Sequence, residues 1–186
     1  MTARRELKAN ETIETERLLL RRPQPDDAAS VFARYAGDPE VTRYLGWPRH
    51  ESLADTHAFL AFSDAEWERW PAGPYLILSR ADGALLGSSG LAFDTPDRAA
   101  TGYVLAKEVW GRGFATEALR AIVEVAPRVG VERLYALCHP DHRPSWRVLE
   151  KCGFRREGIL LRHAEFPNLE PGTLSDVFCY AAHFEH

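Results

Sequence analysis

The stretch from Trp110 to Ala118 constrains the fold more than any other part of the chain. It carries two glycines, Gly111 and Gly113, between an extended apolar run at residues 103–106 and a run with helical spacing. Glycine allows backbone with positive φ and lets a ligand approach closely. The first amides of a helix have no partner within the helix and lie at the positive end of its dipole. A strand, a glycine loop and a helix start in this order therefore predict a site for pyrophosphate.

Size and composition favour one folded domain. The chain has 186 residues, of which 45% are hydrophobic, and a domain of this length can bury about 70% of its unfolded surface. We expect a flexible lead-in at residues 1–11 and a single domain at residues 12–186.

The charge and the cysteines exclude several classes of protein. The net charge is only −4 without a basic stripe, which argues against nucleic-acid binding. Three widely spaced cysteines, Cys138, Cys152 and Cys179, suggest reduced thiols rather than a disulfide framework. Neither a signal core nor an apolar run of membrane length is present, so we expect a cytoplasmic protein without a membrane partner.

The periodicity predicts an α/β protein with a mixed sheet (an α+β arrangement). Alternating or apolar runs indicate about seven strands, at residues 17–21, 75–78, 84–93, 99–105, 133–138, 158–162 and 176–182. Helical spacing indicates about four helices, from residue 25, from Ser52 to about 70, from 114 to 127 and from 144 to 152, with a short helix at 41–45. The Asp82-Gly83 pair predicts a hairpin, and the strand after the glycine loop should lie parallel to the strand before it.

Aromatic and histidine side chains on the helix from Ser52 are interpreted as packing. Leu53, His57 and Leu60 share one predicted face, so His57 is expected to be packed there, and Trp67 and Trp70 are expected in the core. Trp47 is in a loop, which favours a functional role.

Other phosphate or metal sites fit the sequence poorly. The loop lacks the G-x-G-x-x-G and Gly-Lys-Ser/Thr patterns of dinucleotide and Walker sites. Cys138, His139 and His142 are too close in sequence to converge on one zinc ion, and no distant cysteine pair completes a set, so we expect no metal. Residues 87–90 lack the spacing of a nucleophile turn.

Several ordered segments resemble the GNAT N-acetyltransferases, and most closely the RimJ/RimL-like branch. The resemblance covers nearly the whole chain after about Glu11. The segments that carry it are residues 14–21, 38–41 with 44–48, 86–90, 102–103, 110–118, 139–141, and 145 with 147–154. It implies a GNAT fold and an enzyme that takes acetyl from acetyl-CoA.

The resemblance also implies which residues bind the cofactor. The family loop Q/R-x-x-G-x-G/A is matched by Gly113 and Ala115, whereas Trp110 replaces its usual polar first residue. His142 stands where the family often has an asparagine that contacts the pantetheine arm. The cofactor-binding residues implied in this way are Tyr103, Val104, Leu105, Gly111, Arg112, Gly113, Phe114, Ala115, Thr116, His142 and Ser145.

The expected chemistry is direct attack of an amine on the thioester. A backbone amide near Val104 or Leu105 could stabilise the oxyanion. Ser145 matches the family serine near the CoA sulfur, where it would protonate or stabilise the leaving thiolate. Three carboxylates near the final strands, Glu165, Glu170 and Asp176, are candidates to accept the amine proton, and Asp176 is preferred although an ion-paired structural role fits it equally well.

The acceptor and the oligomeric state are left open by the sequence. The acceptor is a small-molecule amine or a protein N-terminus, and the chain is a monomer or a homodimer. A covalent acetyl-cysteine route requires an activated thiolate, for which no adjacent base is evident. The hypothesis from another class is a non-catalytic module that binds acyl-CoA and senses it through a partner.

Overall fold

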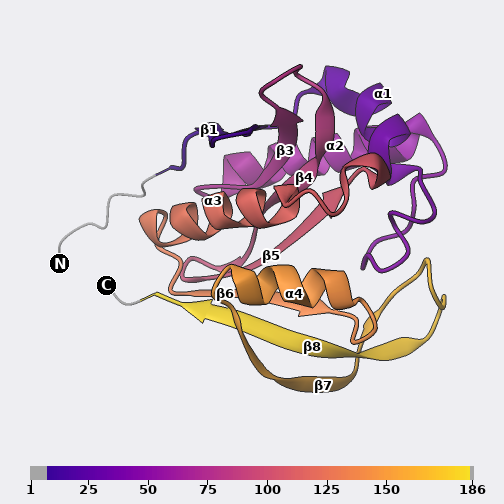
Figure 1. Cartoon of the computed structure of the whole chain (residues 1–186), viewed down its shortest axis with the longest axis vertical. Helices are drawn as coiled ribbons and strands as arrows, with labels where there is room; N and C mark the ends of the chain where they lie inside the picture. Colours follow the sequence, from indigo (N-terminus) through magenta and orange to yellow (C-terminus); the bar gives the residue numbers. More distant parts are fainter. Residues whose placement is uncertain (1–7, 185–186) are drawn as a thin grey trace.

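One mixed sheet of eight strands organises the computed structural model, which describes residues 8–184. Its strands are β1 (Thr12–Glu14), β2 (Leu18–Arg21), β3 (Pro74–Ser79), β4 (Leu85–Thr95), β5 (Arg98–Leu105), β6 (Arg133–Cys138), β7 (Arg155–Glu165) and β8 (Leu174–His183). They lie in the order β1-β2-β3-β4-β5-β6-β8-β7 (Figure 1). The mixed α/β fold is confirmed, with one strand more than expected.

The additional strand is β1, at the edge of the sheet. It pairs antiparallel with β2, with Ile13 opposite Leu20. Its three residues, with a pattern that is mostly exposed, are too short to give a periodic signal. Part of the expected lead-in, residues 1–7, lies outside the described residues, while the Ala9 amide donates to the carbonyl of Pro71 at 2.7 Å.

Pairing between neighbouring strands follows the prediction. Strands β3, β4 and β5 form an antiparallel meander, with the turn at Gly83 in the left-handed region at φ 72°. Strand β6 then pairs parallel with β5. All other neighbouring strands in the sheet are antiparallel.

Four α-helices and several shorter turns connect the strands. Their bounds are η1 (Pro25–Asp27), α1 (Ala28–Val31), the π-helical η2 (Phe32–Ala36), α2 (Leu53–Arg69), η3 (Lys107–Val109), α3 (Phe114–Arg128) and α4 (Arg143–Lys151). The predicted helix at residues 41–45 is wrong, because this segment consists of turns and bends. No helix of the described residues combines the length and the apolar character needed to cross a membrane.

The buried face of α2 differs from the predicted one. It consists of Thr56, Leu60, Ser63 and Trp67, whereas Leu53 is 46% exposed and His57 is exposed. The expectation of a packed His57 is therefore wrong: the face follows the i, i+4, i+7, i+11 spacing that begins at Thr56. The expected burial of Trp67 is confirmed, and its indole N–H donates to the carbonyl of Pro74 at 2.7 Å.

Helices cover both faces of the sheet. On one face, α3 and α4 pack on a large cluster that includes Tyr75, Ile77 and Leu105, and Figure 1 shows these two helices side by side in front of the strands. On the other face, α1 and η2 pack on a smaller cluster with Leu76 and Val104. Because neighbouring residues of a strand point to opposite faces, Leu76 and Val104 face the smaller cluster, whereas Tyr75, Ile77 and Leu105 face the larger one.

Helix α4 ends as the sequence predicts. Gly153 takes φ 86°, its amide bonds to the carbonyl of Glu150, and the Phe154 amide bonds to the carbonyl of Leu149. These two hydrogen bonds define a Schellman motif, and the contact between buried Phe154 and Leu149 belongs to the same cluster. The motif fixes the direction in which the chain leaves α4 for β7.

Leu119→Ala tests the packing of α3 on the sheet. Leu119 is completely buried, so the substitution should lower the free energy of unfolding by about 2–5 kcal/mol through lost burial and the cavity left behind. Urea unfolding measures the change. Leu161→Ala is the control, because Leu161 is 74% exposed and should change stability by less than about 0.5 kcal/mol; equal effects of the two substitutions would contradict the assigned core.

Candidate functional site: a cleft between β5 and β6

The site begins where β5 and β6 separate. Only three residue pairs join these parallel strands, from Arg98 opposite Arg133 to Ala100 opposite Tyr135. Beyond Ala100, β5 continues to Leu105 paired only with β4, and β6 continues to Cys138 paired only with β8. The two strands therefore diverge, and a cleft of about 540 Å³ opens between them.

The edge of β5 that faces this gap carries free peptide groups at alternate residues. The Ala106 amide donates to the carbonyl of Leu86 at 2.7 Å, and Leu105 lies opposite Gly87. Leu105 and Gly87 are therefore a pair without direct hydrogen bonds in the antiparallel ladder. The alternation directs the amides of Leu105 and Tyr103 away from β4, whereas the amide of Val104 is directed toward β4.

The glycine loop presents a row of amides at the start of α3. Gly111 and Gly113 take φ of 72° and 81°, and Gly113 is the N-cap of α3. The first amide with a backbone acceptor is that of Glu117, which donates to the carbonyl of Gly113 at 3.1 Å. Within the part of the chain that the structure describes, the six amides of residues 111–116 have no acceptor. A row of this kind can bind a phosphate group.

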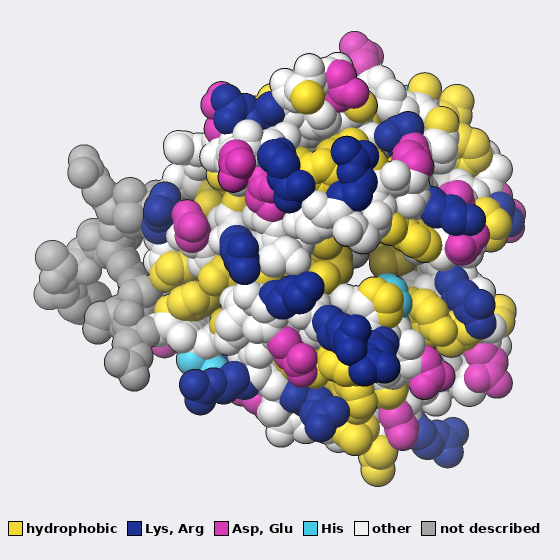
Figure 2. Space-filling view, in the orientation of Figure 1, with side chains coloured by type: hydrophobic (Ala, Val, Ile, Leu, Met, Phe, Trp, Pro, Cys, Tyr) yellow, Lys and Arg dark blue, Asp and Glu magenta, His cyan; other side chains and the backbone are white. Residues whose placement is uncertain are grey.

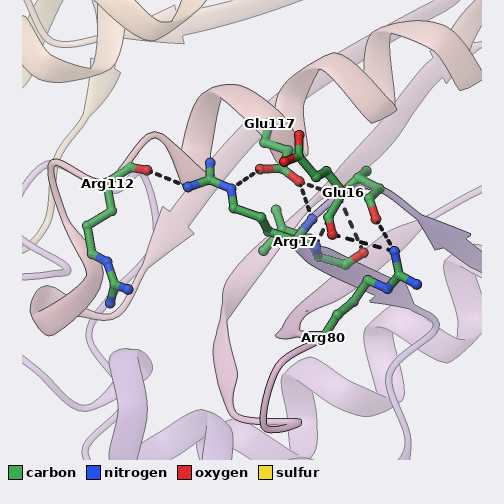
Figure 3. A network of polar contacts seen from close by, with 7 residues as sticks. Glu16, Arg17, Arg80, Arg112 and Glu117 are labelled. Atoms are coloured by element: carbon green, nitrogen blue, oxygen red, sulfur yellow. Dashed lines mark hydrogen bonds and ion pairs between the residues drawn. The ribbon is translucent and has the colours of Figure 1, made fainter.

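An ion pair from the turn between β1 and β2 fixes this loop in place, as Figure 3 shows. The Nε of Arg17 donates to Glu117 at 2.6 Å, and the Arg17 amide donates to the same carboxylate at 2.8 Å. The Thr15 hydroxyl adds a third bond at 2.6 Å. Through Nη1, Arg17 also donates to the carbonyl of Arg112 at 3.0 Å, and its guanidinium lies 4.4 Å from the ring centre of Phe114.

This network places charge beside the row of amides. Burial alone would raise the pKa of Glu117, but hydrogen bonds from Thr15 and Arg17 outweigh burial and hold the pKa below its usual value. Glu117 is therefore ionised at neutral pH, and its charge is matched by that of Arg17. A second guanidinium, that of Arg112, lies 5.1 Å from the ring centre of Phe114, so positive charge remains next to the amides.

Trp110 connects the loop to the edge of β5. Its indole N–H donates to the carbonyl of Leu105 at 2.8 Å, although the side chain is 45% exposed. This bond occupies the Leu105 carbonyl that faces the gap and leaves the Leu105 amide free. The aromatic residue at the first loop position thus holds the loop against the strand through a hydrogen bond.

Tyr103 and Ser145 meet across the cleft. The Tyr103 hydroxyl donates to the carbonyl of Ser145 in the first turn of α4, and it lies 3.1 Å from the Ser145 Oγ. Burial raises the pKa of Tyr103 above its ordinary value, so the phenol is protonated at neutral pH. The structure thus brings together two of the residues that the sequence predicts.

His142 lies in the same part of the cleft, as the N-cap of α4. Its ring stacks on Tyr44 with 4.7 Å between ring centres, and the ring of His139 is tilted against Tyr44 with 5.2 Å between ring centres. Burial lowers the pKa of His142, and the neighbouring His139 lowers it further. The imidazole is therefore neutral at pH 7, and its ring nitrogens bond to none of the described residues.

The predicted acidic residues lie outside the cleft. Asp176 is exposed, and its carboxylate accepts the Arg162 amide at 2.8 Å, where an irregularity interrupts the pairing of β7 and β8. Glu165 accepts the Gly172 amide at 2.8 Å, and Glu170 is exposed. The structure brings none of these three carboxylates to the residues that line the cleft.

Cys138 lines the cleft with a thiol that is not activated. Burial raises its pKa to about 12, so the thiolate, which is the nucleophilic form, is scarce at neutral pH. Cys138, Cys152 and Cys179 are free thiols, as the sequence predicts.

Known proteins resemble the chain over most of its length. The family description "Acetyltransferase (GNAT) domain" matches residues 17–155. YoaA of Bacillus subtilis, described as an uncharacterized N-acetyltransferase, is 32% identical over 81% of this chain and 86% of its own.

Solved structures share the fold. An acetyltransferase of the GNAT family from Bacillus anthracis has a TM-score of 0.80 at 25% identity, and the match covers 92% of this chain and 98% of that one. RimL, a ribosomal L7/L12 α-N-protein acetyltransferase in complex with coenzyme A, has a TM-score of 0.81 over 94% of this chain and 98% of its own. At 23% identity, the likeness to RimL shows the fold alone.

Sequence reasoning missed several residues that shape the cleft. Arg17 and Glu117 are 100 positions apart. The only sequence signal for this pair is their opposite charge, with Arg17 at the start of a predicted strand and Glu117 at the start of a predicted helix. Tyr44 is in the segment interpreted as a helix, where an aromatic stack on His142 could not be expected.

Figure 2 shows the surface hollowed beside α3 and α4, with hydrophobic and histidine side chains near the opening.

Gly113→Val tests the row of amides. Valine is strained at φ 81° and places methyl groups beside the amides, so we expect affinity for coenzyme A to fall at least about a hundredfold. Calorimetry measures the dissociation constant, and thermal unfolding monitors the fold. Gly130→Val is the control, because Gly130 takes φ 93° just after α3 ends and carries similar strain; unchanged affinity in Gly113→Val would exclude the loop from the site.

Proposed function

We propose that this chain acetylates a primary amine by direct attack on acetyl-CoA within a ternary complex. The chain belongs to the GNAT family of acetyltransferases, and acetyl-CoA is its acetyl donor. The observation that carries the proposal is the divergence of β5 and β6, which opens a cleft lined by residues from both faces of the sheet. A donor that enters from one face and an amine that enters from the other can meet between the strands.

The proposed cofactor site combines two sets of backbone groups. The amides of residues 111–116 receive the pyrophosphate, since they are unpaired and lie at the positive end of α3. The pantetheine arm, which has amides of its own, pairs with the free edge of β5 at Tyr103 and Leu105 like an added strand. His142 and Ser145 line the cleft opposite this edge and complete the binding site for the arm.

The reaction itself forms one bond and breaks one. The lone pair of the amine nitrogen attacks the thioester carbonyl carbon, and the C–N bond forms while the C–S bond breaks, giving an N-acetyl amine and coenzyme A. Charge develops on the carbonyl oxygen, where a fixed amide donor stabilises it. One of the two free amides, that of Leu105 or of Tyr103, is the proposed donor, and the other pairs with the pantetheine arm. The amide of Val104 is excluded because the alternation of the ladder directs it toward β4.

Ser145 is the proposed hydrogen-bond donor to the leaving thiolate. The proton that completes the thiol is one that the amine nitrogen releases, so Ser145 keeps its own proton. Its Oγ lies 3.1 Å from the Tyr103 hydroxyl, whose own proton is directed to the Ser145 carbonyl. The pair therefore holds the Ser145 hydroxyl in a defined place beside the expected position of the sulfur. Cys138 is a poor nucleophile because its pKa is raised, which favours direct attack over an acetyl-cysteine intermediate.

His142 is the proposed acceptor of the amine proton. Asp and Glu are absent from the described residues that line the cleft, and His142 is a neutral imidazole there. A neutral imidazole with a free ring nitrogen can accept a proton directly or through one water. This role replaces the one expected for Asp176, whose carboxylate is bound to the Arg162 amide.

A screen for thiol release tests the proposed function. Acetyl-CoA is incubated with the protein and with each of several primary amines, and the freed thiol of coenzyme A is titrated. The enzyme releases thiol in the presence of one amine class. A non-catalytic acyl-CoA sensor binds acetyl-CoA in calorimetry but releases no thiol with any amine, and that outcome would contradict the proposal.

Ser145→Ala separates catalysis from binding. We expect kcat to fall about tenfold to a thousandfold, because the leaving thiolate loses the hydrogen bond from the Ser145 hydroxyl, while the dissociation constant of acetyl-CoA changes less than about threefold. Steady-state kinetics and calorimetry measure the two quantities. Ser175→Ala, on β8, is the matched control, and an Ser145→Ala enzyme with wild-type kcat would remove the catalytic role.

His142→Asn tests the proton acceptor through the pH dependence. Burial and the neighbouring His139 hold the pKa of His142 below its ordinary value, so the ring stays neutral as pH falls through 7 and becomes protonated only below that lowered pKa. With saturating acetyl-CoA, log kcat/KM should decrease as the pH is lowered. The slope should be near 1 above the pKa of His142, where only the amine titrates, and near 2 below it, where the amine and His142 both become protonated.

The His142→Asn variant should lack the steeper limb of the pH profile. Its kcat/KM at pH 7.5 should be about a hundredfold lower than that of the wild type. His139→Asn, which alters the neighbouring histidine, should keep the steeper limb. An unchanged pH profile in His142→Asn would assign the proton acceptor to another group.

A further inference from the structure

The two faces of the sheet divide the cleft into two sides. Tyr103, Ala136 and Leu149 belong to the cluster under α3 and α4, and this side carries Ser145, whose carbonyl accepts the Tyr103 hydroxyl. His142 stacks on Tyr44, next to Leu45, and so lies where the two sides meet. Val104 belongs to the cluster under α1 and η2, with Leu45, Trp47 and Phe59 packed against that cluster. Because Ala136 and Cys138 face α4, Leu137 between them faces the opposite way.

We call the second group of residues the acceptor side; it consists of Leu45, Trp47, Phe59, Val104 and Leu137. All five line the cleft, and each is apolar or aromatic. The free amides of Leu105 and of the row at residues 111–116 belong to the cofactor path, so the incoming amine reaches the thioester from the acceptor side. This assignment rests on the proposed function.

Charged side chains are missing from the cleft. None of the residues that line it within residues 8–184 is Asp, Glu, Lys or Arg. Its polar side chains are hydroxyls, one thiol and one imidazole that is neutral at pH 7. A second ammonium or a carboxylate on the acceptor would therefore lose water in the cleft without gaining an oppositely charged partner there, which disfavours its binding.

The apolar lining also helps the reacting nitrogen. An alkylammonium ion has an ordinary pKa of about 10 and must lose a proton before it attacks. Desolvation in an apolar environment lowers the pKa of an amine, so the acceptor side favours the neutral nucleophile.

We propose that the acceptor is a monoamine whose body is apolar, of the arylalkylamine or alkylamine class, without a carboxylate or a second cationic group. The lining residues supply hydrophobic surface for such a body, and the cleft has space for a small molecule beside the acetyl group. Polyamines, aminoglycosides, free amino acids and peptide N-termini carry charges or polar amides that this lining leaves unpaired.

Matched pairs of amines test the proposal with the wild-type protein. Pentylamine and 1,5-diaminopentane differ by one ammonium, and 2-phenylethylamine and phenylalanine differ by one carboxylate. Thiol release from acetyl-CoA gives kcat/KM for each, with kanamycin and a serine-terminated peptide as further acceptors. We expect kcat/KM of each added-charge partner to be at least about a hundredfold lower, as an unpaired buried charge requires.

A charge placed on the acceptor side should change this preference. In Leu137→Glu the new carboxylate can pair with the second ammonium, so the ratio of kcat/KM for 1,5-diaminopentane over pentylamine should rise at least about tenfold. Leu137→Gln has the same shape without the charge and should leave the ratio unchanged. Circular dichroism checks that both variants fold, and if either does not, the wild-type substrate pairs decide alone.

The outcomes separate this inference from the proposed function. Efficient release with 1,5-diaminopentane, phenylalanine, kanamycin or the peptide, at a kcat/KM equal to or above that of the monoamines, would overturn the acceptor class and leave amine acetylation intact. Release with no amine at all, while calorimetry shows bound acetyl-CoA, would overturn both.

Discussion

The early divergence of β5 from β6 is the constraint on which the site depends. Parallel strands normally continue their hydrogen bonding, but here three pairs are followed by a gap. Each strand keeps a full partner on its outer side, β4 for β5 and β8 for β6, so the sheet tolerates the separation. The gap exposes peptide groups that elsewhere would be buried in a ladder, and an unpaired buried peptide group is costly. A ligand that carries amides can satisfy them.

The second requirement is that the glycine loop holds its shape before a ligand arrives. Glycines allow the positive φ values that turn the amides toward one point, but the same freedom raises the entropy lost on ordering. Contacts from distant segments offset that loss: Glu117 bonds to Thr15 and Arg17, Arg17 bonds to the Arg112 carbonyl, and Trp110 bonds to the edge of β5. The loop is thereby coupled both to the turn between β1 and β2 and to the edge of β5. A preordered site requires less ordering on binding, which favours affinity.

Much of this fold can be predicted from local patterns. The meander of β3 to β5, the parallel return of β6 and the Schellman end of α4 each follow from short signals such as Asp82-Gly83 and Gly153. The phosphate loop follows from glycines placed between a strand and a helix. Local patterns failed where burial depends on distant partners: β1 forms because β2 is beside it, the face of α2 is shifted so that Thr56 and Trp67 are buried, and residues 41–45 bend as turns that place Tyr44 over His142.

The chemistry of the cleft was harder to predict for the same reason. The sequence places Asp176, Glu165 and Glu170 near the final strands, but not the direction in which their carboxylates point. A strand register and one irregularity in β7 decide that Asp176 meets the Arg162 amide instead of the cleft. The cleft itself contains the neutral imidazole of His142, the hydroxyls of Tyr103 and Ser145, and apolar surface. The proposed acceptor of the amine proton is therefore His142 and not an acidic residue.

Residue-resolved amide hydrogen exchange, with and without acetyl-CoA, tests most directly whether the diverging strand and the glycine loop hold the cofactor through their peptide groups. We expect acetyl-CoA to slow exchange at residues 111–116 and at Tyr103 and Leu105, whereas Val104, whose amide is directed toward β4, is already protected in the free protein. If acetyl-CoA binds but exchange at residues 111–116 is unchanged, the glycine loop does not hold the cofactor through its peptide groups.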